Sequence, residues 1–148
     1  MCIRDRPHFD LRSDLKEDWF DDSAFKTAFE NGFSLLFPIG EKAFIESVRN
    51  FEDHISDPKL LKEIRAFYGQ EAAHRKIHQE YNQTLCEVRG YDLDHLTKPQ
   101  VERHQNRYSE LSPYQRLAAT VAAEHLTCLL YTSPSPRDAT LSRMPSSA

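Results

Sequence analysis

The sequence predicts an all-α protein, a helical bundle of which three helices are present and a fourth is expected. Apolar residues recur at helical spacing along nearly the whole chain, and no stretch of convincing length alternates as a strand does. N-cap residues followed by proline divide the chain into long segments. These observations together favour long helices joined by short loops.

The first two helices are bounded by clear local signals. The first starts near Ser23, a favourable N-cap residue, and Pro38 should kink or break it before it resumes over residues 40–55. The second starts at Ser56-Asp57-Pro58, where a cap residue precedes a proline at the first helical position. It should end at Gly90, a good C-terminal stop.

The rest of the chain predicts one further helix. Residues 91–110 are polar, and we expect no more than a short helix after Pro99. Ser112-Pro113 repeats the cap-plus-proline signal and starts the last helix, which we expect to run to Thr127.

The two ends of the chain resemble translated adapter sequence. Residues 1–6, MCIRDR, resemble a translation of a transposase-type sequencing adapter, and CLLYTSPSPRD near the other end resembles its opposite strand. We therefore predict that residues 1–6 and 128–148 are adapter-derived, the latter disordered, and that residues 7–127 form one truncated helical domain. A Ser/Pro-rich disordered tail of the protein itself is the alternative.

The amino-acid composition limits the kinds of partner and the cellular location that we expect for the protein. The chain has 19 basic and 23 acidic residues, and leaving out both terminal stretches lowers the net charge from −4 to −6. An acidic domain argues against nucleic acid and anionic membranes as partners. No apolar run approaches the roughly 20 residues of a membrane span. Only Cys86 lies within residues 7–127, so we expect no disulfide and a cytoplasmic location.

Three polar residues interrupt the apolar stripe of the second helix. At about 100° per residue, Glu71, His74 and His78 fall within an arc of about 60° that also contains Leu85, and Ile64 lies about 20° beyond it. Burying a carboxylate and two imidazoles is costly unless they are paired or bind a metal. An ion pair between Glu71 and His74 is the structural alternative, and the third residue favours the metal.

Glutamates take similar positions in the other two helices. Glu41 lies in an apolar stripe with Phe37 and Phe44. The helix dipole stabilises a carboxylate near a helix start, and this explains the position of Glu41 about as well as a role as metal ligand does. Glu124 lies on one face of the last helix with Val121. One glutamate from each of two helices, and Glu-x-x-His from each of the other two, is typical of the ferritin-like dimetal bundle. The second Glu-x-x-His would lie on a fourth helix, beyond residue 127.

The segments FPIGEKAFIESVRNF, AFYGQEAAHRKIHQEYN and AAEHLT carry a family resemblance. Over residues 33–127 the chain resembles a bacterial family described as predicted metal-dependent hydrolases. The resemblance implies a helical, metal-binding protein with these functional residues: Glu41, Glu71, His74, His78 and Glu124. The family pattern continues with a late Glu-Glu-x-Glu-His segment that this sequence lacks. We therefore expect the fragment to hold metal weakly or not at all and to be inactive by itself.

The cofactor expected is a divalent metal, iron or manganese, with zinc as the alternative, because the ligands are rich in carboxylates. The resemblance favours hydrolysis of a small-molecule substrate by metal-activated water. The residues alone favour a di-iron oxidase or oxygenase. A non-enzymatic helical interaction module is the third hypothesis, and a homodimer is left open.

For Tyr81 and Asn82 we prefer ordinary packing to a role beside a ligand histidine.

Overall fold

The computed structural model describes residues 11–132, and these form helices and loops without a strand. This confirms the all-α prediction. The elements are α1 (Leu11–Asp14), α2 (Ala24–Arg49), the short 3-10 helix η1 (Glu52–His54), α3 (Pro58–Arg89), α4 (Leu93–Glu110) and α5 (Pro113–Thr132). Among these residues no helix combines the length and the apolar character needed to cross a membrane.

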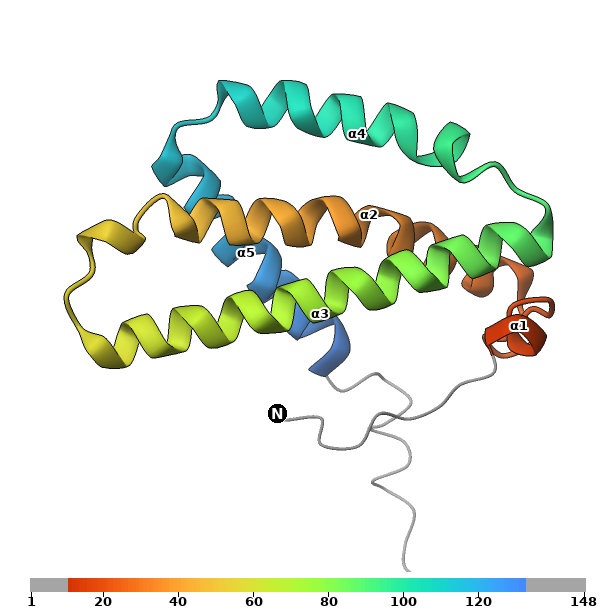
Figure 1. Cartoon of the computed structure of the whole chain (residues 1–148). Coiled ribbons are helices and arrows are strands. Elements are labelled where there is room, and N and C mark those ends of the chain that lie inside the picture. The colour runs from red at the N-terminus through yellow and green to blue at the C-terminus, as the bar shows by residue number, and fades with distance from the viewer. Residues whose placement is uncertain (1–10, 133–148) are drawn as a thin grey trace, which may run out of the picture.

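Helix α2 is the centre of the arrangement. It contacts α3, α4 and α5, and its partner α3 runs antiparallel to it (Figure 1). Helix α4 lies along the opposite side of α2 from α3, and α5 crosses behind α2 at a steep angle (Figure 1). The contact between α2 and α3 is the most extensive, and the candidate site lies there.

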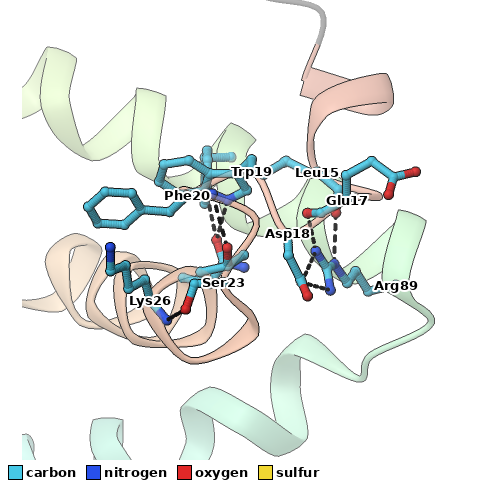
Figure 2. Close-up of polar contacts among 11 residues, drawn as sticks. Leu15, Glu17, Asp18, Trp19, Phe20, Ser23, Lys26 and Arg89 are labelled. Carbon is cyan, nitrogen blue, oxygen red and sulfur yellow. Dashed lines mark hydrogen bonds and ion pairs between the residues drawn. The ribbon is translucent and has the colours of Figure 1, made fainter.

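Arg89 ties the segment before α2 to the end of α3 (Figure 2). Arg89 donates hydrogen bonds to the backbone carbonyls of Leu15, at 2.8 Å, and Glu17, and it also reaches the carboxylate of Asp18 at 3.3 Å. Leu15 is 2% exposed. The arginine therefore anchors the turn that leads into α2 and satisfies carbonyls that no helix pairs.

The predicted boundaries at Ser23, Asp57 and Gly90 agree with the structure. Ser23 and Asp57 accept hydrogen bonds from backbone N–H groups in the first turns of α2 and α3. Gly90 ends α3 with a φ of 69°, a left-handed conformation that glycine adopts without steric penalty. Pro58 occupies the start of α3, where the N–H that proline lacks would have no helical partner.

Of the kink or break expected at Pro38, the break is wrong, because α2 continues through this residue. A proline inside a helix removes the hydrogen bond to the carbonyl four residues earlier, here that of Ser34. The side-chain amide of Asn82 on α3 donates to this carbonyl at 3.0 Å. A partner from the neighbouring helix thus replaces the lost bond.

The polar stretch after Gly90 also differs from the prediction. It forms an 18-residue helix, α4, that starts six residues before Pro99 and has no buried residue. Asp92 caps it by accepting a hydrogen bond from the backbone of His95. Polarity made this segment resemble a loop, although Leu93, Leu96, Val101 and Tyr108 recur at helical spacing and are half-buried, and the Tyr108 hydroxyl donates to the Ala43 carbonyl of α2 at 3.1 Å. Four long helices are therefore present among residues 11–132.

Only residues 128–132 of the predicted disordered tail lie within the part of the chain that the structure describes. Helix α5 continues to Thr132, so residues 128–132, which we predicted to be disordered, are helical. Residues 1–6, and the tail from residue 133 onwards, lie outside the described part of the chain.

Candidate metal centre

Three of the predicted site residues meet between α2 and α3. Glu41 comes from α2, and Glu71 and His74 come from α3, with one candidate ligand atom from each lying within 4.8 Å of the others. Glu41 and Glu71 are 3% and 2% exposed, and His74 is half-buried. The two helices therefore bring two buried carboxylates and one imidazole to a single point.

The helical stripe on α3 explains why Glu71 is buried. Ile64 and Leu85, on the same stripe, are 7% and 2% exposed. His74 lies about one helical turn after Glu71, so both side chains face α2. Leu60 is the exception on this stripe because, at 42% exposed, it only borders the groove beside α5.

His78 lies beside this cluster. Its Nε2 is 3.9 Å from Glu41 Oε1, and its side chain is 30% exposed. The ring packs against Phe37 with 4.6 Å between the ring centroids. Burial, and then the neighbouring His74, lower the pKa of His78, which favours the neutral imidazole. A neutral imidazole is the form that binds a metal.

Glu124 approaches the cluster from α5. It is half-buried and borders an open groove of about 360 Å³ between α2, α3 and α5. Its charge contributes to raising the pKa of both Glu41 and Glu71, which places its carboxylate near theirs. Val121, predicted for the same face, also borders the groove and is 61% exposed. The structure thus brings Glu124 near the three clustered residues but not into their 4.8 Å group.

The electrostatics of the two buried carboxylates favour a cation. The pKa of each is raised from 4.5 to about 7, chiefly by burial, and Arg75 partly opposes the rise at Glu41. Glu41 Oε2 is buried and has no hydrogen-bond partner among the described residues. Such a group must be protonated or meet a positive charge to be stable. The arrangement can therefore bind a divalent cation.

A hydrogen-bonded pair behind His78 was not predicted. The Ser34 hydroxyl lies 3.0 Å from His78 Nδ1 and donates to Asn82 Oδ1 at 2.8 Å. Asn82 is thus linked to His78 through Ser34, so hydrogen bonds as well as packing hold it, and a role beside a ligand histidine stays a prediction. The signal that could have indicated this pair is Pro38, which lies four residues after Ser34 and leaves its carbonyl unpaired.

A separate cavity of about 770 Å³ lies between α2, α3 and α4. Pro38, Arg75 and Asn82 border it, so it adjoins the residues behind the cluster. Arg75 Nε is buried and has no hydrogen-bond partner among the described residues. The volume is in the range of small-molecule sites.

Comparison with known proteins gives one match. A family model described as "Predicted metal-dependent hydrolase" matches residues 4–141, and this range contains all five predicted site residues. It confirms the resemblance that the motifs indicate, and it also covers part of both stretches that we assigned to adapter. No match was found among curated proteins or among solved structures.

Proposed function

The chain belongs to the family of predicted metal-dependent hydrolases, and from this premise we propose that Glu41, Glu71 and His74 bind a divalent metal for hydrolysis. The observation that carries the proposal is the meeting of these three ligand groups within 4.8 Å, with Glu41 Oε2 buried and unpaired. Carboxylate and imidazole together suit iron, manganese or zinc. Since carboxylates outnumber imidazoles, we propose iron or manganese.

His78 and Glu124 are proposed as further ligands. His78 Nε2 lies 3.9 Å from Glu41 Oε1, and a small rotation of either side chain would let both reach one ion. Glu124 has the flexible stem and the nearby charge that would let its carboxylate join from α5. This ligand set from three helices supports a ferritin-like arrangement.

A divalent metal bound there would lower the pKa of a water molecule and supply the nucleophile for hydrolysis. The residues of the chain would bind the cation and orient the substrate. Glu41 and Glu71, with pKa values of about 7, release any proton they hold when they bind the cation. The 770 Å³ cavity would hold a small-molecule substrate, and Arg75 at its edge would orient an anionic group of that substrate.

One experiment tests this function. The metal-free chain is loaded with Mn²⁺ or Zn²⁺ without oxygen and assayed on ester and phosphoester substrates. The sequence alone predicts an inactive fragment, but three ligand groups meet within this chain. We therefore expect turnover that requires metal and is lost in Glu71→Gln, whereas Glu80→Gln, exposed on the same helix, retains it. Metal binding without turnover of any substrate in the panel would count against hydrolysis.

A di-iron oxidase or oxygenase is the second candidate. It is favoured by carboxylates from three helices, Glu41, Glu71 and Glu124, which is the ligand type of that chemistry. Oxygen uptake by the iron-loaded, reduced chain would support it. A folded chain that binds no metal at all would instead support a helical interaction module with structural Glu and His.

The setting of the protein is proposed on the same basis. We propose a cytoplasmic protein that binds no nucleic acid and acts alone or as a homodimer. The net charge of −4 argues against nucleic acid, and the free, buried thiol of Cys86 fits a reducing compartment.

A further inference from the structure

We propose that Ser34 and Asn82 hold His78 in the tautomer that protonates Nδ1, so that the lone pair of Nε2 faces the carboxylates. The two residues act as positioning residues, and Pro38 makes their arrangement possible. The metal part of this inference rests on the proposed function, but the tautomer itself is a property of the metal-free chain.

The first step is the carbonyl that Pro38 leaves without a helical partner. Proline has no N–H, so the Ser34 carbonyl loses the bond that residue 38 would otherwise donate. Ser34 is 6% exposed, so water cannot readily take that place. Asn82 Nδ2 donates to this carbonyl at 3.0 Å instead.

The second step is the orientation of the Asn82 amide. A carbonyl oxygen only accepts hydrogen bonds, so the group that faces the Ser34 carbonyl must be the NH₂ of Asn82. This places Asn82 Oδ1, which only accepts, 2.8 Å from the Ser34 hydroxyl. The hydroxyl must therefore donate its hydrogen to Asn82.

The third step is the proton on His78. A hydroxyl has one hydrogen, and that of Ser34 is used by Asn82. His78 Nδ1 lies 3.0 Å from the same oxygen, so in this contact Nδ1 must be the donor. In the neutral ring Nε2 then carries the lone pair. That atom is the one 3.9 Å from Glu41 Oε1, on the side of the cluster.

The packing around the network keeps the ring in place. Phe37 lies against the imidazole at 4.6 Å, and Asn82 is 3% exposed. Metal-binding histidines commonly donate their other ring N–H to an oxygen that sets tautomer and orientation. Here the accepting oxygen is the Ser34 hydroxyl on α2. Asn82 on α3 takes the hydrogen of that hydroxyl, so the hydroxyl can only accept from His78.

The test reads the tautomer directly by NMR. The metal-free chain, labelled with ¹⁵N in histidine, is examined at pH 8, where an ordinary imidazole is neutral, by long-range ¹H–¹⁵N correlation. We expect His78 to show a protonated Nδ1 and an unprotonated Nε2. A protonated Nε2 in the wild-type chain would overturn the proposal, whether or not the chain binds metal.

Substitutions then test the cause. In Asn82→Leu the Ser34 hydroxyl is free to donate to Nδ1, so we expect the proton to move to Nε2. Ser34→Thr keeps the hydroxyl and should keep the wild-type tautomer. Gln83→Leu, an exposed neighbour on α3, is the matched control and should change nothing. A folded Asn82→Leu chain with the wild-type tautomer would contradict the network.

A second variant covers the case in which Asn82→Leu does not fold. Pro38→Ala restores an N–H for the Ser34 carbonyl, so the Asn82 amide is no longer held in one orientation. We expect an Nε2–H population to appear in a chain whose helical circular dichroism is retained. An unchanged tautomer would contradict the role of the proline.

Metal affinity provides the link to the site. We expect Mn²⁺ binding to weaken about 10- to 100-fold in Asn82→Leu, as when other residues that orient ligand histidines are lost. An unchanged affinity beside a changed tautomer would show that His78 is not a ligand. If Mn²⁺ does not bind the wild-type chain either, the proposed function fails while the tautomer result stands.

Discussion

Replacing Glu41 by glutamine should stabilise the metal-free protein at neutral pH. Burial is the main cause that raises the pKa of this carboxyl from 4.5 to about 7, and Glu71 and Glu124 add to it. Glutamine has nearly the same shape but carries no charge. The substitution therefore removes the penalty of ionising a buried group and leaves the packing of α2 against α3 in place.

The sign and size of this change in stability follow from the ordinary pKa of the Glu41 carboxyl, 4.5, and its raised pKa of about 7 in the folded chain. The folded state holds the proton more tightly than the unfolded state, so wild-type stability falls as pH rises from 4.5 through about 7. The difference corresponds to about 3 kcal/mol once pH exceeds 7. His78 has a lowered pKa, which gives the opposite pH dependence in the wild-type chain. Its Nε2 lies 3.9 Å from Glu41 Oε1, so its contribution changes with the substitution.

Urea denaturation of both proteins in the presence of a chelator, from pH 4.5 to pH 8.5, measures this difference. The gain of Glu41→Gln over wild type should be near zero at pH 4.5 and reach about 3 kcal/mol at pH 8. Glu46→Gln is the matched control on α2, since its side chain is 45% exposed, and it should stay within about 0.5 kcal/mol of wild type. A gain that does not depend on pH, or a loss of stability at pH 8, would refute the burial argument.

Three further predictions concern the frame that positions the site. Asp57→Ala removes the cap of α3 and should lower the free energy of unfolding by about 1 kcal/mol in urea; no change would deny the cap its role. Gly90→Ala places a side chain at a φ of 69° and should lower stability by about 1–2 kcal/mol, and a stabilised variant would contradict the left-handed end of α3. Arg89→Met keeps the apolar stem but frees the carbonyls of Leu15 and Glu17, so limited proteolysis should cut before α2 sooner than in wild type; equal protection would show that the anchor is unimportant.

The helix boundaries and the cluster on α3 could be predicted because their signals are local. Asp57 and Gly90 mark the ends of α3 by capping chemistry that depends on a few neighbouring residues. The spacing of Glu71 and His74 on an apolar stripe depends only on helix geometry. Glu41 could be placed on a stripe in the same way, but whether it met Glu71 depended on how α2 packs on α3.

The network behind the site could not be predicted from local patterns. Pro38 predicts a break when α2 is considered alone, and only the amide of Asn82 from another helix makes continuation stable. The buried face of α2 is also unusually polar and includes these residues: Thr27, Asn31, Ser34, Glu41 and Ser47. Such groups are stable inside only with partners from elsewhere in the fold, which a one-dimensional pattern does not reveal.

Manganese titration of the metal-free chain, followed by electron paramagnetic resonance of the free ion, tests the central claim most directly. The sequence alone predicts weak metal binding or none, but the structure brings Glu41, Glu71 and His74 together. We therefore predict saturable binding by the wild-type chain that weakens by about tenfold or more in Glu71→Gln. Glu80→Gln, which removes an exposed carboxylate from the same helix, should bind as the wild type does. A wild-type chain that binds no Mn²⁺, or a Glu71→Gln chain that binds it equally well, would contradict the metal centre.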